Sequence, residues 1–260
     1  MTPAVPPAVP PAVPPAVLSA VPSAVPPAVP SAVPSAVPPP MASAVIGRIL
    51  PPPLRAAETF ADIAAPLFAA EETALAGAGR QRRAEFATGR ACARAALAGL
   101  GVPAVPIVPG ACGEPRWPAG TTGSITHCAG YRACAVGPAE AAAAVGIDAE
   151  PNLPLPGGLL AAVASRAERG WLADRMTAAP WVCWDRLVFS AKESVYKAWF
   201  SLTGRRLRFE DAVIVADPAD GRLIARLMVP GPPGGRQLTR LHGRWLAAGG
   251  LVLTTIVIPA

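Results

Sequence analysis

The order of apolar and polar residues predicts a helix-rich stretch followed by a group of strands. Apolar positions recur at helical spacing over residues 68–100, and two glutamates near the start of this stretch favour a helix. A turn-rich stretch follows at residues 110–123. The short apolar runs after it predict strands at residues 124–128, 131–136 and 144–150.

The same order repeats after a proline-broken segment at residues 151–156. A helical pattern lies around residues 159–176, and a stronger one begins at residue 184 and ends near residue 202, where Gly204 closes it. The remaining runs predict strands at residues 212–216, 223–229, 244–248 and 251–258. The last run is β-branched and far too short to span a bilayer, so we interpret it as a buried strand.

This doubled order predicts the fold class α+β (α/β), with two similar helix-plus-sheet halves in one chain. The chain has 260 residues, which is long enough for one large core or two smaller linked ones. We place the join near residues 151–156 and expect the halves to span residues 41–153 and 154–260.

The chain begins with a four-residue repeat, AVPP or AVPS, that fills most of residues 1–40 without a charged residue. Proline at this density removes backbone donors and fixes φ, so we expect a disordered, polyproline-like tail. We expect no secretory signal, because a basic start and an uninterrupted apolar region are missing. Met41 follows directly and offers an alternative start, and a proline-rich ligand for a partner domain is the less supported reading.

The formal charge of +6 belongs entirely to the residues after this tail. A basic surplus suits an anionic partner, such as nucleic acid, a membrane, a polyphosphate metabolite or an acidic protein, but does not choose among them. The five cysteines are odd in number and form no CxxC pair, so neither a disulfide framework nor a zinc knuckle is favoured. We therefore expect a protein of the reducing cytoplasm.

Two acids stand at the end of a predicted strand, in the sequence VGIDAEP. Asp148 and Glu150 are two residues apart, so the alternation of a strand places both carboxylates on one face. Two carboxylates that project together repel each other unless a cation or a basic group intervenes. Since Mg²⁺ prefers carboxylate and phosphate oxygens, the pair predicts a site for a hard cation.

A third acid lies on the strongest predicted helix, in FSAKESVYKAW. Glu193 has Lys197 four residues later on the same helical face and Ser190 three residues before it. Taken singly, such a pair or a DxE sequence is more often structural than functional. Their joint occurrence, in a chain that also has a basic helix, favours a functional site.

His127 lies on a short predicted strand, in GSITHC, just after a glycine-containing turn. A lone histidine more often satisfies a local hydrogen bond than contacts a ligand. The chain has one other histidine, His242, and two histidines this far apart without suitable cysteine or acidic spacing do not support a metal site.

Several stretches together resemble the 4'-phosphopantetheinyl transferases of the surfactin and enterobactin synthase type, and particularly the actinobacterial branch of the enterobactin-like group. The resemblance runs from about residue 80 to the C-terminus and leaves the tail outside. It is carried by RRAEFATGRACARAAL from Arg82, GEPRWPAGTTGSITHCAGYRA from Gly113, VGIDAEP from Val145, WDRLVFSAKESVYKAWF from Trp184 and, more weakly, GRWLAAGGLVLT from Gly243.

The resemblance implies a fold, an activity and a set of partners. The fold would be a pseudo-dimer of two α/β halves in one chain, with coenzyme A bound in the cleft between them. The activity would be the Mg²⁺-dependent transfer of 4'-phosphopantetheine from coenzyme A to a serine of an apo acyl- or peptidyl-carrier protein, with release of 3',5'-ADP; Mn²⁺ would be a substitute. The carriers would belong to fatty acid, polyketide or nonribosomal peptide synthases, including those of siderophores. We expect a cytoplasmic monomer that binds neither nucleic acid nor a membrane.

The resemblance also implies roles for individual residues. The metal ligands would be Asp148, Glu150 and Glu193. The catalytic residues would be Glu193, Lys197 and Asp148. The residues that bind coenzyme A would be Arg82, Arg90, Ser124, Thr126, His127, Lys192 and Lys197, with His127 at the 3'-phosphate and Lys197 at the pyrophosphate.

The chain departs from the family pattern at two points. Phe189 stands where the wider family often has Trp, an apolar replacement of small consequence. Relatives commonly carry a lysine in the loop before GSITHC, where this chain has Pro109, Cys112 and Glu114, so this chain lacks the lysine that the family pattern places near a phosphate.

Two alternatives come from other classes of function. The basic residues between Arg80 and Arg94 suit a nucleic-acid-binding module, although no recognised binding motif accompanies them and aromatic residues are few. A degenerate paralogue would keep the fold without the activity, although the three acids are intact.

Overall fold

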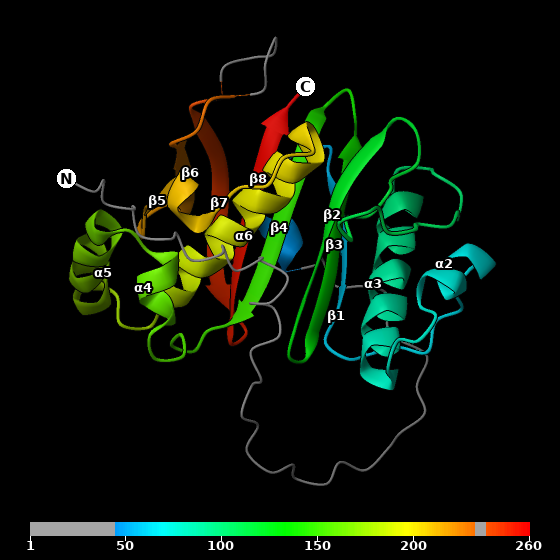
Figure 1. The fold of residues 1–260 in the computed structure, drawn as a ribbon, viewed down its shortest axis with the longest axis horizontal. Helices are drawn as coiled ribbons and strands as arrows, with labels where there is room; N and C mark the ends of the chain where they lie inside the picture. The colour runs from blue at the N-terminus through cyan, green and yellow to red at the C-terminus, as the bar shows by residue number, and fades with distance from the viewer. Residues whose placement is uncertain (1–44, 232–237) are drawn as a thin grey trace, which may run out of the picture. The chain divides into compact units, whose positions relative to one another are not determined.

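The computed structural model describes residues 45–231 and 238–260, which belong to one compact unit. The tail predicted for residues 1–40 lies outside the described residues. Two antiparallel sheets form the frame of this unit. Each sheet has its own long helix, which covers one of its faces (Figure 1).

The smaller sheet has three strands in the order β1-β3-β2. They are β1 (Arg55–Thr59), β2 (Thr121–Cys128) and β3 (Tyr131–Pro138). Helix α3 (Arg80–Ala98) packs on β3 and β1, and the short α2 (Ala69–Ala74) precedes it. Small buried side chains at this contact, including Ala93 and Cys134, let the helix approach the sheet closely.

The larger sheet has five strands in the order β4-β8-β7-β6-β5. They are β4 (Ala142–Pro151), β5 (Ala212–Ala216), β6 (Arg222–Leu227), β7 (Arg240–Ala248) and β8 (Leu251–Pro259). Helix α6 (Trp184–Thr203) lies along β4 and β8 (Figure 1). The shorter elements are η1 (Ile46–Ile49), α4 (Leu159–Val163), α5 (Arg166–Ala178) and η2 (Phe209–Asp211).

The sheets meet at their edge strands, β2 and β4, which lie side by side without forming a strand pair. Side chains replace the missing backbone ladder. The Ser124 hydroxyl accepts a hydrogen bond from the Ile147 amide (3.1 Å), and the Thr126 hydroxyl accepts one from the Ala149 amide (3.1 Å). A buried cluster of β3, β4 and β8 side chains, which Ile49 from η1 joins, continues through the joint.

Most predicted elements are confirmed, and two predicted helices are divided. The pattern at 68–100 gives α2 and α3, separated by a turn in which Gly77 adopts a positive φ of 80°. The pattern at 159–176 gives α4 and α5, because Ser165 caps a new helix: its side chain accepts a hydrogen bond from the Glu168 amide. The terminal apolar run forms β8, and among the described residues no helix has the length and apolarity that crossing a bilayer needs.

The mixed helix and sheet class is confirmed, whereas the pseudo-dimer stays a prediction. Each part has a helix on an antiparallel sheet, but the sheets have three and five strands. The expected boundary after residue 153 would leave β4 in the first half, although its hydrogen-bonded neighbour is β8. Strand β4 therefore ties the two parts together.

Candidate active site

Two acids project from β4 on the face that α6 covers. Asp148 and Glu150 alternate with buried apolar residues, as the strand pattern predicts. Gly146 lies earlier on the same face and lets α6 rest directly on the strand. A Cβ at this glycine would come within 1.9 Å of the Ser194 carbonyl oxygen. The glycine of the VGIDAEP sequence is thus required by the close approach of the helix.

A buried polar seam fixes α6 against β8. The hydroxyl oxygens of Ser190 and Thr254 lie 3.0 Å apart, and those of Ser194 and Thr254 lie 2.8 Å apart. Because polar groups in an apolar interior must keep their partners, this seam holds the helix at one height along the strand. Glu193 and Lys197, one helical turn apart, are thereby positioned beside the β4 acids.

Asp148 has one oxygen in use and one free. Its Oδ1 accepts hydrogen bonds from Lys197 Nζ (2.7 Å) and from the Thr126 hydroxyl (3.1 Å). Lys197 Nζ also donates to the Ile147 carbonyl oxygen (2.9 Å). Asp148 Oδ2 is buried and has no hydrogen-bond partner among the described residues.

Glu193 is almost completely buried, at 8% exposure. Its Oε1 has no hydrogen-bond partner among the described residues. Burial raises the pKa of Glu193 to about 7; the charge of Asp148 also raises it, and the ammonium of Lys197 lowers it. A carboxyl group in this state costs stability when ionised, so it favours a cation or a proton.

Glu150 has a fixed counter-charge. Arg186, in the first turn of α6, donates from Nη1 to Glu150 Oε2 at 3.1 Å. Burial nevertheless raises the pKa of Glu150 to about 8, and Asp148 adds to the rise, whereas Arg186 and Lys197 lower it. Glu150 therefore has a raised affinity for a proton, although it forms an ion pair with Arg186.

Arg186 is a further residue of this site that no sequence pattern predicts. Its Nε donates to the Leu153 carbonyl oxygen (3.0 Å) and its Nη2 to the Pro154 carbonyl oxygen (2.9 Å). The adjacent Asp185 accepts a hydrogen bond from the Leu155 amide (2.8 Å). The start of α6 thus clamps the loop that follows the acids. The proline-rich sequence of that loop predicts a break in structure but not its partner.

The free carboxylate oxygens suit a hard cation, because such cations bind carboxylate oxygens. Asp148 Oδ2 and Glu193 Oε1 are buried, lie on facing elements and have no hydrogen-bond partner in the part of the chain that the structure describes. No three His, Cys, Asp or Glu side chains within residues 45–231 and 238–260 already converge as a ligand set. The donor chemistry therefore fits Mg²⁺ or Mn²⁺, and the side chains would have to adjust to surround the ion.

A group of cations lies on the other side of the joint, around His127 on β2. The outer part of His127 is exposed, but the surrounding protein desolvates the imidazole enough to lower its pKa; Lys197, Arg82 and Arg132 lower it further, and Glu85 opposes them. His127 is therefore mostly neutral near pH 7 until an anion approaches. Arg82, which begins the RRAEFATGR sequence, is exposed in the first turn of α3.

Arg90 has a different environment from Arg82. It is buried, its guanidinium lies 3.9 Å from the centre of the Phe86 ring, and its Nε donates to the Ile107 carbonyl oxygen (2.6 Å). Burial lowers its pKa to about 10. Arg90 thus supports the loop that leads towards β2, a role that the sequence pattern does not reveal.

Three residues that the resemblance assigns to coenzyme A binding form side-chain hydrogen bonds within the protein. Lys192 is the clearest case: its side chain is 1% exposed, and Nζ donates to Glu168 Oε2 and to the carbonyl oxygens of Val163 and Phe209, all within 2.9 Å. This lysine is not available to a ligand. The hydroxyls of Ser124 and Thr126 bridge the two sheets.

The loop before β2 has no lysine, and its acid is structural. Glu114 accepts a hydrogen bond from the Cys112 amide (2.9 Å), and the Gly110 amide donates to the Glu114 carbonyl oxygen (2.7 Å). The described site therefore consists of three acids, Lys197 and the cations near His127. Acids that can bind a divalent cation, next to fixed cations, suit the handling of phosphate groups.

Two family models match the chain. One, described as the 4'-phosphopantetheinyl transferase N-terminal domain, matches residues 70–137. The other, described as the 4'-phosphopantetheinyl transferase superfamily, matches residues 144–249 and includes the three acids and Lys197. The first match includes Arg82 and His127.

Three curated proteins are similar over most of the chain. They are the 4'-phosphopantetheinyl transferase Svp of Streptomyces mobaraensis, 54% identical over 75% of this chain and 79% of that protein; PptT of Mycobacterium tuberculosis, 51% identical over 68% and 80%; and Npt of Nocardia iowensis, 46% identical over 72% and 87%. Enterobactin synthase component D of Salmonella typhi is more distant, at 38% identity over 48% of this chain.

Proposed function

Because the chain belongs to the 4'-phosphopantetheinyl transferase superfamily, we propose that the site between β4 and α6 transfers phosphopantetheine from coenzyme A to a serine of an apo acyl- or peptidyl-carrier protein. The observation that carries this proposal is the pair of buried, unpartnered oxygens, Asp148 Oδ2 and Glu193 Oε1, beside Lys197. Such oxygens bind a cation or a proton, and the reaction needs both functions near the phosphates.

Asp148, Glu150 and Glu193 would hold Mg²⁺, or Mn²⁺ as a substitute. When bound, the ion neutralises phosphate charge so that an oxygen nucleophile can approach. Asp148 and Glu193 offer free oxygens, whereas Glu150 shares its charge with Arg186. We therefore expect Glu150 to contribute less to cation binding than the other two acids.

Glu193 and Lys197 would move the protons of the transfer. As the serine hydroxyl oxygen forms its bond to the β-phosphate, the Glu193 carboxylate accepts the hydroxyl proton through the oxygen that does not bind the cation. The bond from the β-phosphorus to 3',5'-ADP breaks, and Lys197 Nζ stabilises or protonates the departing phosphate oxygen. Without a bound cation, burial raises the pKa of Glu193 to about 7.

The cations around β2 would bind the far end of coenzyme A. His127 and Arg82 are the exposed members of this group, and we propose that they meet its 3'-phosphate. A phosphate dianion beside the imidazole would raise the pKa of His127. The imidazole would then take up a proton and add a positive charge to that of Arg82. Arg90 would act from within the protein, by supporting the neighbouring loop.

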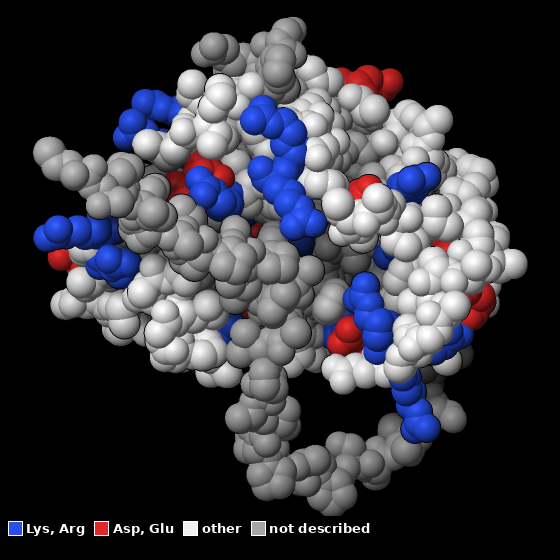
Figure 2. Space-filling model, viewed as in Figure 1, with Lys and Arg blue, Asp and Glu red and all other residues white. Residues whose placement is uncertain are grey.

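The carrier protein would approach a positively charged molecule. Figure 2 shows Lys and Arg side chains spread over the visible face, with acidic side chains between them, and the chain has a net charge of +6. An acidic carrier is steered towards such a surface, and this steering weakens with salt. We propose carriers of fatty acid, polyketide or nonribosomal peptide synthases, including siderophore synthases, with the enzyme acting as a cytoplasmic monomer.

One assay tests this function. The protein is incubated with coenzyme A, Mg²⁺ and several apo carriers, and the carriers are weighed by mass spectrometry. We expect the phosphopantetheine increment on at least one carrier and on no carrier whose serine is replaced by alanine. A correctly folded protein that modifies no carrier would contradict the proposal and favour a paralogue that keeps the fold without the activity.

A further inference from the structure

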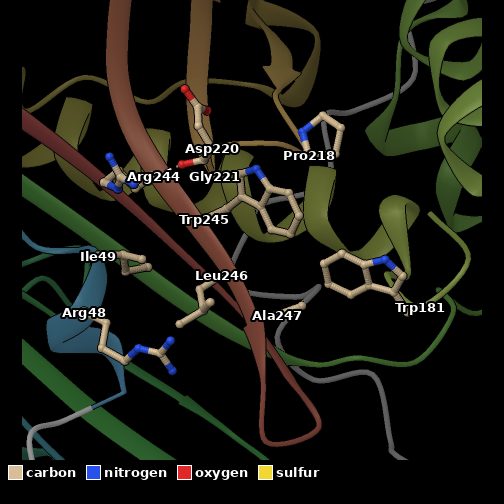
Figure 3. A pocket seen from close by; sticks show the side chains of 10 residues that line it. All are labelled: Arg48, Ile49, Trp181, Pro218, Asp220, Gly221, Arg244, Trp245, Leu246 and Ala247. Atoms are coloured by element: carbon tan, nitrogen blue, oxygen red, sulfur yellow. Dashed lines mark hydrogen bonds between the residues drawn. The ribbon is translucent and has the colours of Figure 1, made fainter. Parts of the chain in front are cut away.

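Within residues 45–231 and 238–260, no strand pairs with the end of β7 on the side away from β8, so this edge is open. Strand β6 pairs with β7 only as far as Arg244, and the amide of Trp245 then donates to the Gly221 carbonyl oxygen (2.8 Å). Beyond this point β7 continues to Ala248 with β8 on its other side. A groove of about 280 Å³ surrounds the open edge (Figure 3). We call it the β7-edge groove.

The hydrogen-bonding groups of Ala247 point into this groove. Gly249 and Gly250 both have a positive φ and form a two-residue hairpin between β7 and β8, so Ala248 and Leu251 close it as a hydrogen-bonded pair. Such pairs alternate along an antiparallel ladder. Trp245 and Ala247 therefore turn their backbone groups away from β8. An open edge of this kind is a template for another extended chain.

The two faces of the edge differ in chemistry. On one face, Trp181 stacks over Trp245, with ring centres 6.3 Å apart and planes 28° apart. Trp181 is 60% exposed, so its ring offers an apolar surface that the protein does not cover. On the other face, Arg48 of η1 and Arg244 of β7 project beside Leu246 (Figure 3).

The second face is positively charged. Arg48 and Arg244 are both exposed. Asp220 also lines the groove, but its carboxylate pairs with Arg222 at 2.9 Å, and Arg244 contacts only its backbone oxygen (3.0 Å). Asp220 therefore does little to neutralise the two arginines, and the groove attracts carboxylates.

We propose that the β7-edge groove binds an extended acidic segment of a partner protein, which adds to the sheet as a strand beside Ala247. Side chains of a strand alternate between faces. A segment of alternating apolar and acidic residues would thus place its apolar side chains on Trp181 and its carboxylates against Arg48 and Arg244. Backbone hydrogen bonds would supply affinity, and the two faces would supply selectivity.

This binding site is separate from the acids of β4. Strand β8 lies between β7 and β4, and neither arginine of the groove contacts the acids or Lys197. The proposal therefore goes beyond the transfer reaction and does not depend on it. Substitutions in the groove should leave the modification of a small isolated carrier protein unchanged.

The test uses the full chain and two synthetic probes. One probe is a fluorescein-labelled ten-residue peptide of alternating valine and glutamate, and the other has lysine in place of glutamate. Binding is measured by fluorescence anisotropy. We expect the acidic probe to bind at least about tenfold more tightly than the basic probe. Equal affinity for the two probes, or no binding of the acidic one, would overturn the proposal.

Three variants locate the binding. Ala247→Pro removes the amide at the open edge, Trp181→Ala removes the apolar surface, and the double change Arg48→Glu with Arg244→Glu reverses the charge. We expect each variant to bind the acidic probe at least about fivefold more weakly than the parent protein does. Arg226→Glu is the matched control, because this exposed arginine lies on β6 outside the groove. The control should bind like the parent protein.

The variants also distinguish a bound peptide from a second copy of the chain. Trp181 and Arg48 are exposed, so their replacement tests the groove even if Ala247→Pro fails to fold. Retained binding in both exposed-site variants would place the peptide elsewhere and overturn the proposal. A concentration-dependent dimer in light scattering, abolished by the same variants, would assign the edge to a second copy of the chain instead.

Discussion

Glu193 is a buried carboxyl group that costs the folded protein stability when it is ionised. Burial raises its pKa from 4.5 to about 7, so the folded protein binds this proton more tightly than the unfolded chain does. The stability that depends on this proton is present at low pH and is lost as the pH rises through this range. A neutral amide at this position does not suffer that loss.

We therefore expect Glu193→Gln to raise the melting temperature of the metal-free protein at pH 8 by roughly 2–6 °C. At pH 5 the difference should largely disappear, because the parent carboxyl group is then protonated. Differential scanning calorimetry at both pH values measures the effect, with the exposed Glu140→Gln as control. A lower melting temperature than the parent at pH 8 would show that the buried carboxylate has a stabilising partner.

His127 should take up a proton when coenzyme A binds. Its lowered pKa leaves it mostly neutral at pH 7, and a nearby phosphate would raise that pKa and protonate it. Titration calorimetry in two buffers of different ionisation enthalpy measures this uptake. His127→Gln should reduce it to near zero, whereas His242→Gln, at an exposed position on β7, should leave it unchanged. Equal uptake by both variants would remove His127 from the binding site.

The two lysines of α6 should separate stability from activity. Lys192→Met leaves Glu168 as a buried charge, which costs about 3–5 kcal/mol in the free energy of unfolding. Lys197→Met should cost much less stability, because this side chain is 26% exposed, but should greatly reduce the transfer rate. Urea unfolding and initial rates measure the two effects. Adding Glu168→Gln to Lys192→Met should restore part of the stability. A Lys197→Met enzyme with parental rates would contradict the proposed role of Lys197 in the transfer.

At the scale of elements, the contact between β4 and α6 decides whether the acids and Lys197 face one another. Gly146→Ala would bring a Cβ within 1.9 Å of the Ser194 carbonyl oxygen, so the helix must shift. We expect a loss of about 1–3 kcal/mol in the free energy of unfolding and a fall in the transfer rate as Glu193 moves. Denaturant unfolding and initial rates measure both changes.

A glycine on another helix provides the matched control. Gly170 lies within α5, and a Cβ there would meet no atom within 4 Å. Gly170→Ala should therefore stabilise the protein by about 0.5–1 kcal/mol and leave the rate unchanged. If Gly146→Ala behaves like Gly170→Ala, the close approach of α6 to β4 does not matter for the site.

Sequence patterns predict the elements better than they predict their interruptions and partners. Periodicity identifies α6 and β8, because their apolar faces are long and continuous. It does not separate α4 from α5, because the cap at Ser165 is a local hydrogen bond within an otherwise helical pattern. The alternation of β4 correctly places Asp148 and Glu150 on one face.

What the sequence could not reveal depends on contacts between distant residues. Lys192 and Lys197 look alike in FSAKESVYKAW, but the first faces Glu168 and the second faces Asp148. Likewise, the clamp of Arg186 on the loop after β4 depends on contacts 33 and 32 residues away in sequence. Helix periodicity gives the face of a side chain, whereas its partner follows only from the packed fold.

At the scale of the whole molecule, the candidate site lies where two sheets meet without pairing. The hydroxyls of Ser124 and Thr126 hold β2 beside β4, so the cations near His127 and the acids of β4 belong to different sheets. In the proposed function, this joint would give the molecule a basic side for one end of coenzyme A and an acidic side for a cation. Both ends of one extended substrate can then be held at once.

The most direct test of this account is the transfer rate of Glu193→Gln with a carrier that the parent enzyme modifies. The phosphopantetheine increment is followed by mass spectrometry at saturating coenzyme A and Mg²⁺. We expect the rate to fall by at least about 10²-fold, while the variant remains folded and at least as stable as the parent without metal. A variant that retains near-parental turnover would contradict the claim that Glu193 serves the reaction.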